Sequence, residues 1–307
     1  METAFSCYRT GMEHFLQEHS SAFADFRLLD TGDGYRLEQW GPYRLARPDP
    51  QIIWKRHLPE AEWQKTDAMF VTVGEKGRWD LRTRVPGFWT VSYTPTGSDT
   101  VVSLNARLTP FKHTGIFAEQ SANWEWMAKV LRGKKNRKIL NLFGYTGAAT
   151  VVLTSLGHGV THVDASKPAI GWAKDNQTLS KLPPDSIRWI LDDAQKFVMR
   201  ELKRGQKYDG ILMDPPAFGH SPDGRTWKFN QDLPNLLSDC IELLSDDADF
   251  LLINGYATNS SAIALKNLLE DALKGRKGAL EYGELCLQQK DARLISTGIF
   301  ARWSGNA

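Results

Sequence analysis

From Lys112 onward, the chain alternates between short apolar runs and longer stretches with helical periodicity. The apolar runs have the length and composition of strands: RKILNLF, THVDAS, IRWILDDA, YDGILMD, DFLLINGY, YGELCLQQ and STGIFARW. The stretches between them repeat apolar residues at helical spacing: ATVVLTSLG, KPAIGWAKDNQTLSKL, QKFVMRELKRG, LPNLLSDCIELL and SAIALKNLLEDALKG. This alternation predicts an α/β fold, with a mostly parallel sheet and helices on both faces. No long helix separates the last two runs, so we expect a closing hairpin that adds an antiparallel strand at or near one edge.

A different texture precedes Pro110. Short runs such as YRLEQWG, AMFVTVG and FWTVSY are separated by turn-forming breaks such as GPY, RPDP, TPTG and VPG. This pattern predicts a small β-rich domain over residues 1–110, followed by the α/β domain over residues 111–307. Some aromatic residues of this region could stack on bases, although we expect more of them in the core of the small domain: Trp54, Trp63, Trp79 and Trp89.

The bulk composition limits the class of protein. The 307 residues suffice for two domains, and contents of 41% hydrophobic and 24% charged residues are ordinary for a globular chain. A net charge of +2 is compatible with a nucleic-acid partner without demonstrating one. Cys7, Cys240 and Cys286 form no CxxC pair, which favours a reducing compartment over disulfides or zinc. No stretch approaches the roughly 20 apolar residues that span a bilayer, and the first residues lack the apolar core of a secretion signal. We therefore expect a cytoplasmic protein with no membrane partner.

The first run of the α/β part leads into a glycine loop, NLFGYTGAAT. Gly144 and Gly147 flank Tyr145 and Thr146 and precede a helix, whose N-terminus offers unpaired N–H donors. The loop is neither GxGxxG nor a phosphate loop ending in Gly-Lys-Ser/Thr, which counts against a dehydrogenase. By itself the glycine pair is equally compatible with a tight strand-to-helix turn.

The next three strands end in acidic residues. Asp164 follows the loop by about twenty residues, where an acid can accept hydrogen bonds from both ribose hydroxyls. Asp192 and Asp193 come next, where one could accept from an adenine amino group, although either could instead cap the following helix. Asp214 is followed by two prolines. Proline fixes the backbone φ angle and has no N–H group, so this segment is rigid and has spare carbonyl acceptors. Because ligands bind beyond the carboxyl ends of strands in such sheets, the coincidence favours one shared ligand site over capping alone.

The motifs NLFGYTG, HVDAS, LDDA and DPPAFG, in this order and spacing, resemble those of class I S-adenosylmethionine-dependent methyltransferases. More narrowly, they are similar to the bacterial group related to the 5-methylcytosine and 7-methylguanine enzymes of large-subunit ribosomal RNA. In that group KTGxFxDQR precedes the first motif, and HTGIFAEQS stands there in this chain. Glu119 replaces the aspartate, and His113 and Ser121 depart from the pattern. The resemblance covers roughly residues 112–303 and implies a Rossmann-like seven-stranded methyltransferase sheet. It also implies S-adenosyl-L-methionine as the cofactor.

The resemblance also implies roles for individual residues. The glycine loop would line the methionine end of the cofactor, Asp164 would bind the ribose, and Asp193 with Ala194 the adenine. Asn176 would shape that side, and Gln120 would close the site. The implied cofactor-binding set is Gln120, Phe143, Gly144, Tyr145, Thr146, Gly147, Asp164, Ala165, Ser166, Asn176, Asp192, Asp193, Ala194 and Asp214.

The catalytic residues implied for the acceptor side are Asp214, Pro215 and Phe218. The carboxylate and the Pro215 carbonyl would hold a planar substrate edge, and Phe218 would stack on it. Methylation of cytosine C5 needs a cysteine nucleophile, and neither DPPAFG nor INGYATNSS contains one, which disfavours that reaction. Asn254 and Tyr256 are further candidates for substrate contact, although Tyr256 could simply pack at the sheet edge.

The remaining features identify the substrate less directly. Basic clusters LRGKKNRK and RELKRGQK could meet phosphates, as could Arg225 and Lys228 in the segment after DPPAFG, but such runs are more often solvated faces. The histidines lack HxxxH or HExxH spacing, so we expect no metal. The sequence thus predicts a methyltransferase acting on RNA, with ribosomal RNA as the favoured substrate. Methylation of a protein or small molecule, and a non-catalytic RNA-binding protein, remain the alternatives. The oligomeric state is left open.

Overall fold

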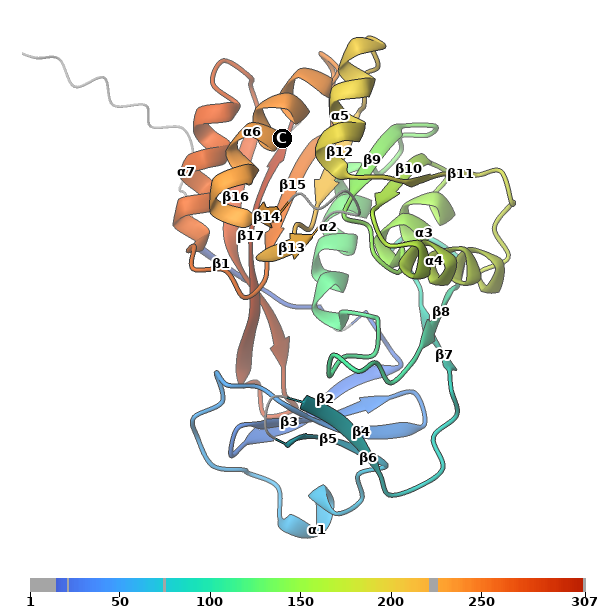
Figure 1. Ribbon diagram of the computed structural model, residues 1–307, viewed down its shortest axis with the longest axis vertical. Helices are drawn as coiled ribbons and strands as arrows, with labels where there is room; N and C mark the ends of the chain where they lie inside the picture. Colours follow the sequence, from blue (N-terminus) through green and yellow to red (C-terminus); the bar gives the residue numbers. More distant parts are fainter. Residues whose placement is uncertain (1–14, 21, 74–75, 221–225, 306–307) are drawn as a thin grey trace, which may run out of the picture.

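The computed structural model describes residues 15–20, 22–73, 76–220 and 226–305. Within these residues, the larger part of the molecule is an eight-stranded sheet with the order β1-β16-β17-β15-β12-β9-β10-β11 (Figure 1). Its strands are β1 (Phe15–Glu18), β9 (Lys138–Leu142), β10 (Gly159–Asp164), β11 (Ile187–Leu191), β12 (Gly210–Met213), β15 (Phe250–Gly255), β16 (Ala279–Gln288) and β17 (Leu294–Ser304). The α/β fold predicted from the alternation is confirmed.

Helices cover both faces of this sheet. They are α2 (Ser121–Val130), α3 (Ala148–Ser155), α4 (Lys167–Leu179), α5 (Ala194–Lys203), α6 (Phe229–Leu243) and α7 (Ala262–Ala272). Helices α2, α3 and α4 lie on one face of the sheet, and α5, α6 and α7 lie on the other. The side chains of the central strands point alternately into the two cores beneath these helices. Phe250 and Leu252 pack into the core that contains α2 and α3, whereas Leu251 and Ile253 pack into the core that contains α5, α6 and α7. Burial on both faces explains why β15 begins with four consecutive apolar residues, 250–253.

The closing hairpin is also confirmed. Strand β17 runs antiparallel to both β15 and β16, near one edge of the sheet. Beyond the seven strands that the resemblance implies, β1 adds an eighth by pairing in parallel with β16, with Phe15 opposite Tyr282. An ion pair between Glu18 and Arg302 (2.8 Å) holds β1 to the hairpin. A segment that precedes residue 110 therefore contributes to the α/β sheet.

The rest of the N-terminal region is β-rich, as predicted. A five-stranded sheet has the order β2-β3-β4-β5-β6, and β7 pairs with β8. Its elements are β2 (Phe26–Gly32), β3 (Tyr35–Trp40), β4 (Tyr43–Pro48), α1 (Glu60–Trp63), β5 (Ala68–Val73), β6 (Lys76–Leu81), β7 (Trp89–Tyr93) and β8 (Val102–Ala106). Trp63 and Trp89 are buried, so these two serve the core rather than stacking.

Strand β8 packs directly on α4 of the α/β part. The backbone N–H of Asn105 donates to Oδ1 of Asn176 at 2.8 Å, and the Trp172 indole donates to the Asn105 carbonyl at 2.9 Å. One hydrophobic core contains both Trp40 of β3 and Val151 of α3. The two parts of the chain therefore share buried surface.

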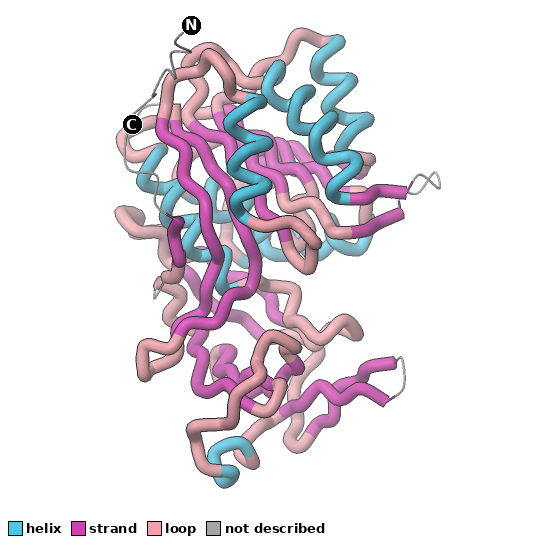
Figure 2. The backbone as a smooth tube through the Cα atoms, turned by 90° about the vertical axis from the view of Figure 1, so that its left-hand side faces the viewer, coloured by secondary structure: helices cyan, strands magenta, loops and turns pink. Residues whose placement is uncertain are grey.

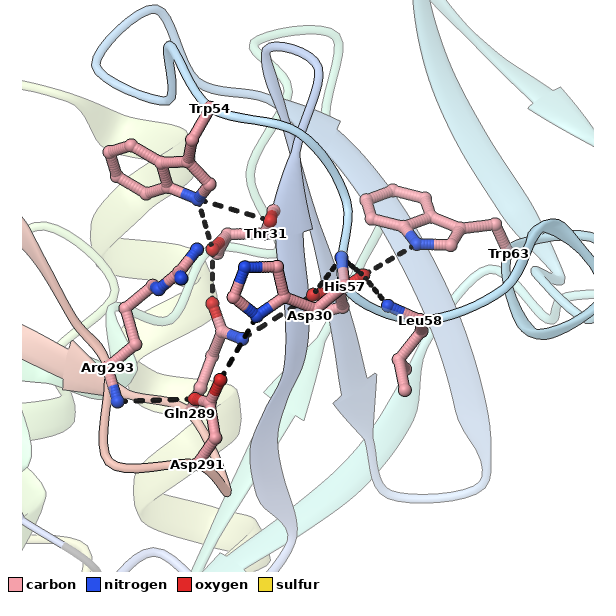
Figure 3. A network of polar contacts seen from close by, with 9 residues as sticks. All are labelled: Asp30, Thr31, Trp54, His57, Leu58, Trp63, Gln289, Asp291 and Arg293. Atoms are coloured by element: carbon pink, nitrogen blue, oxygen red, sulfur yellow. Dashed lines mark hydrogen bonds and ion pairs between the residues drawn. The ribbon is translucent and has the colours of Figure 1, made fainter.

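The long β16–β17 hairpin makes a second junction, since it runs from the helical layer to the N-terminal sheet (Figure 2). Figure 3 shows the contacts at its tip. Asp30 of β2 is fully buried and accepts hydrogen bonds from the Leu58 backbone N–H and the Trp63 indole, both at 2.9 Å. From the hairpin, Gln289 contacts Asp30 and Thr31. No helix in the described ranges is long and apolar enough to cross a bilayer.

Candidate active site

The site lies where the strand order reverses. From β9 the chain proceeds outward through β10 to β11 and then returns to β12 on the other side of β9. The carboxyl ends of these strands consequently flank one crevice, the usual ligand position in open α/β sheets. A cavity of about 710 Å³ opens there, within the range of small-molecule sites. Residues from all four predicted strand ends line it: Phe143, Tyr145, Asp164, Ala165, Ser166, Asp192, Asp193, Ala194, Asp214, Pro215 and Pro216.

A smaller cavity of about 70 Å³ adjoins it and shares Phe117, Phe143, Tyr145 and Asp214 with it. Gln120, Gly144, Thr146 and Asn254 line this smaller space. Asp214 therefore faces both cavities.

The glycine loop has an unusual backbone. Phe143 (φ 57°) and Tyr145 (φ 48°) lie in the left-handed region, on either side of Gly144. Such conformations are costly for residues other than glycine and concentrate at ligand sites. A Cβ on Gly144 would lie 2.4 Å from Cε1 of His162, and one on Gly147, whose φ is 77°, would lie 2.7 Å from Cβ of Ala173. Both glycines are required by the packing beneath the loop, and Gly147 lines neither cavity.

A buried polar network under the loop was not foreseen from the sequence. His162 on β10 is fully buried, and its Nδ1 lies 2.9 Å from Oγ1 of Thr150. Asn141 Nδ2 donates to the same hydroxyl at 2.8 Å. Burial lowers the pKa of His162 to about 3, so the ring is neutral at physiological pH. The loop thus rests on an uncharged aromatic ring.

Asp164 is placed to face the cavity. Its Oδ2 accepts the Tyr145 backbone N–H and its Oδ1 accepts the Ser166 backbone N–H, both at 2.8 Å. Burial raises its pKa from the ordinary value, against these two hydrogen bonds. The hydroxyl of Ser166 caps α4 by accepting the Ala169 N–H at 3.3 Å. Because Ser166 fills the capping role, Asp164 is not needed as a cap.

The acid pair after β11 supplies one helix cap and two cavity-lining side chains. Asp193 caps α5 by accepting the Lys196 backbone N–H at 3.0 Å. Asp192 forms an ion pair with Arg200 and accepts the Asp193 backbone N–H at 2.9 Å. Both aspartates also line the large cavity, with Ala194. Capping and cavity lining therefore coexist at this strand end.

Two further residues of the implied cofactor set support the site from behind or from the side. Asn176 is fully buried and lines neither cavity; its Nδ2 donates to the Thr146 carbonyl at 2.8 Å, which fixes the loop from behind. Gln120 reaches the smaller cavity from the 3₁₀ turn Ala118–Gln120. Its Nε2 donates to the Tyr256 hydroxyl at 2.9 Å, and its Oε1 accepts from Asn254 at 3.3 Å. Asn254 and Tyr256, expected near the substrate, lie at the site.

Asp214 ends β12 in an environment that disfavours its charge. Burial, with a smaller contribution from the carboxylate of Glu119, raises its pKa to about 7. Glu119 is itself buried, and burial raises its pKa as well. At neutral pH, Asp214 can therefore exchange a proton.

The aromatic residues around Asp214 differ in part from the expected set. Phe218, on β13 (Phe218–His220), is 56% exposed and lines neither cavity. Trp227, on β14 (Thr226–Lys228), lines the large cavity instead. Its indole donates to the Pro216 carbonyl at 2.7 Å and packs on Phe143 with ring centroids 5.1 Å apart. Phe111 and His113 line the cavity as well. His113 begins the segment HTGIFAEQS, whereas no sequence pattern marks Phe111 or Trp227.

The two described cysteines lie in the core. Cys240 is fully buried, and burial raises its pKa; burial raises the pKa of Cys286 to about 11. Neither lines the cavities, and Cys7 is outside the described residues, as is Arg225. Among the side chains that the structure describes, no three His, Cys, Asp or Glu residues are grouped to hold a metal ion.

A doubly wound sheet with a glycine loop and successive acids around one cavity at its switch point defines a nucleoside-binding protein of the class I methyltransferase type. A crystal structure of a S-adenosylmethionine-dependent methyltransferase from Agrobacterium tumefaciens is 39% identical, has a TM-score of 0.88, and covers 98% of both chains. A second methyltransferase structure, a complex with S-adenosylhomocysteine, is 17% identical with a TM-score of 0.71 over 92% of this chain and 76% of the other, and shares the fold. The chain belongs to the S-adenosylmethionine-dependent methyltransferases and uses S-adenosylmethionine.

Curated relatives extend the comparison. Ribosomal RNA large subunit methyltransferase K of Neisseria meningitidis is 26% identical over 250 residues, which span 78% of this chain and 67% of that protein. Ribosomal RNA large subunit methyltransferase K/L of Shewanella baltica is 33% identical over 149 residues, 48% of this chain. The match spans only 20% of the K/L protein's length. No family model matches the chain.

Proposed function

We propose that this enzyme methylates a base of large-subunit ribosomal RNA. The proposal is supported by the names of the two curated relatives, which match 78% and 48% of this chain. The match spans only 20% of the K/L relative, so its name alone does not assign the substrate of this chain. We therefore infer the substrate from the relatives and from the site together. A ribosomal RNA substrate agrees with the cytoplasmic location expected from the sequence.

The residues of the large cavity fit the cofactor. When bound, S-adenosylmethionine supplies an electrophilic methyl group on a sulfonium. Asp164 would accept hydrogen bonds from the ribose hydroxyls with the lone pairs that Tyr145 and Ser166 leave free. Asp192, Asp193 and Ala194 would contact the adenine, and Gln120 with the glycine loop would hold the methionine end in the smaller cavity. Asn176 would keep the loop in place without touching the cofactor.

The position of Asp214 carries the proposal. It alone among the acids at the strand ends faces both cavities, so it lies between the expected methionine end and the open space for an acceptor. With a pKa of about 7, its carboxylate can accept an N–H of a planar acceptor and take the proton that a nitrogen loses on methylation. The backbone carbonyl of Pro215 would orient the same edge. Because no described cysteine reaches the cavity, we favour a base nitrogen over cytosine C5.

Transfer of tritium from labelled S-adenosylmethionine tests the proposal. The acceptor would be large-subunit ribosomal RNA transcribed in vitro, with small-subunit ribosomal RNA as the control. We expect label that ribonuclease removes and proteinase does not, and none with the D214A variant. Label retained after ribonuclease but lost after proteinase would support the protein-methyltransferase alternative. Nucleoside analysis of labelled RNA would identify the methylated atom.

A further inference from the structure

A tight turn from Thr109 to His113 borders the large cavity. The His113 carbonyl accepts from the Thr109 N–H at 3.1 Å and from its hydroxyl at 2.8 Å. The Thr109 hydroxyl also accepts the Phe111 N–H at 3.3 Å, and Lys112 takes up a left-handed conformation with φ 59°. These contacts define one conformation that brings Phe111 and His113 to the cavity.

The N-terminal sheet supports this turn from below. Arg47 of β4 donates from Nη1 to the Lys112 carbonyl at 3.1 Å. It is held by a bidentate pair with the buried Glu38 of β3, at 2.7 and 2.8 Å. The Trp79 indole of β6 donates to the Thr109 carbonyl at 2.7 Å. Two residues of a different sheet thus fix two carbonyls of the turn, so the turn is built for a defined position.

The turn presents aromatic faces toward solvent. Phe111 is 72% exposed although it lines the cavity. Its ring lies nearly parallel to that of His113, at 24° with centroids 6.2 Å apart, and His113 meets the ring of Tyr145 edge-on at 5.8 Å. Burial, with Arg47 nearby, lowers the pKa of His113 to about 4, which leaves its ring uncharged at neutral pH. The exposed ring of Phe111 therefore continues a half-buried aromatic row formed by His113 and Tyr145 at the cavity.

We propose that Phe111 and His113 form a stacking platform for a nucleobase of the substrate, next to the base that is methylated. The inference rests on the proposed RNA substrate and names residues that contact it. Every nucleobase has a π-face, so a fixed and solvent-exposed phenyl ring recognises one irrespective of sequence. Phe143 and Trp227 also line the cavity and pack on each other, which leaves a second aromatic surface for the methylated base itself. Arg47 is a positioning residue for the platform.

Substitutions of Phe111 separate stacking from bulk. F111L keeps an apolar side chain but loses the aromatic face, whereas F111W keeps an aromatic face. F88L is the control, because Phe88 is also exposed (60%) but lies outside the cavity. On large-subunit ribosomal RNA that the wild type methylates, we expect F111L to raise KM by about tenfold. F111W and F88L should stay near wild type, and all three should bind S-adenosylhomocysteine equally in calorimetry. An unchanged KM for F111L would overturn the platform.

A second measurement does not depend on catalysis. The tryptophan of F111W should be quenched when a mixed-sequence single-stranded RNA of 20 nucleotides is added, relative to the same titration of the wild type. If the wild type methylates no RNA, the proposed function fails, and this titration alone decides the platform: quenching supports it and its absence overturns it. If a protein is labelled instead, and F111L raises the KM for that protein, the nucleobase is the wrong occupant.

Discussion

Arg47 donates a hydrogen bond to the backbone carbonyl of Lys112 at 3.1 Å, which ties the N-terminal sheet to the mouth of the active-site cavity. The N-terminal region is therefore part of the site's construction. Its contacts with α4 and with the tip of the β16–β17 hairpin fix it further against the α/β part.

Removing Arg47 should destabilise the protein and raise the KM for RNA. Although burial alone would raise the pKa of Glu38, Arg47 and Arg36 hold it below the ordinary value. R47M leaves this buried carboxylate with less compensation, so we expect a loss of about 3–5 kcal/mol in the free energy of unfolding. E38Q/R47M should recover part of the loss in urea titrations. If R47M unfolds at the same urea concentration as the wild type, the pair is not a structural unit.

Asp164→Asn should weaken cofactor binding. The amide keeps the shape but loses the charge and one of the two acceptors used by the Tyr145 and Ser166 N–H groups. We expect about 10- to 100-fold weaker binding of S-adenosylhomocysteine in calorimetry, as for a charge-assisted hydrogen bond. Asp185→Asn, at an exposed position outside the cavity, is the matched control. Equal affinities for the two variants would remove Asp164 from the cofactor site.

The pH dependence of methyl transfer should report Asp214. Its pKa of about 7 implies that kcat/KM rises with pH up to about 7 and then levels off, because the ionised carboxylate is the acceptor form. The neighbouring Glu119 and Tyr256 also have raised pKa values, so the protons of this cluster are coupled. D214N should be slow and lack this rise. A wild-type profile that is flat between pH 5 and 8 would contradict a proton-accepting Asp214.

The same ionisation affects stability with a defined sign. Between the ordinary aspartate pKa of 3.8 and about 7, the native state retains a proton that the unfolded chain has released. The Asp214 contribution to the free energy of unfolding therefore decreases as pH rises across this window. D214N should show a weaker decline in chemical denaturation measured at several pH values.

Gly144→Ala should disrupt the loop through His162. The added methyl group would lie 2.4 Å from the buried imidazole ring, so the ring or the loop must move. We expect a loss of about 1–3 kcal/mol in stability and weaker S-adenosylhomocysteine binding. In a double-mutant cycle with H162A, the loss of stability in the double variant should be smaller than the sum of the losses in the two single variants. Additive losses would mean that the two residues do not compete for space.

Methyl transfer should not require a cysteine. The C7A/C240A/C286A variant replaces all three cysteines of the chain, of which two are buried and outside the cavities. We expect a lower melting temperature, since Cys240 packs in the core, with kcat within about twofold of wild type at a temperature where the variant is folded. A folded variant without activity would restore cysteine chemistry as a possibility.

The strand ends could be predicted because parallel strands place their carboxyl ends at one edge of a sheet. The glycine loop after the first strand and the acids after the next three must therefore lie near one another. In the structure, Asp164, Asp192, Asp193 and Asp214 all line one cavity. The order of apolar and helical stretches likewise determines the layers and the closing hairpin. These features depend on local pattern and on chain topology, which are properties of the sequence itself.

Other parts of the site depend on which distant segments pack together. Phe111 and His113 reach the cavity because Arg47 fixes their turn. Arg47 lies 65 residues before Lys112, whose carbonyl it binds. Trp227, rather than Phe218, lines the large cavity, and its indole donates to the Pro216 carbonyl. Strand β1 joins an edge that its own four residues do not specify. Such contacts are selected by tertiary packing, where the gain comes from burying complementary surfaces, and no local pattern in the sequence encodes them.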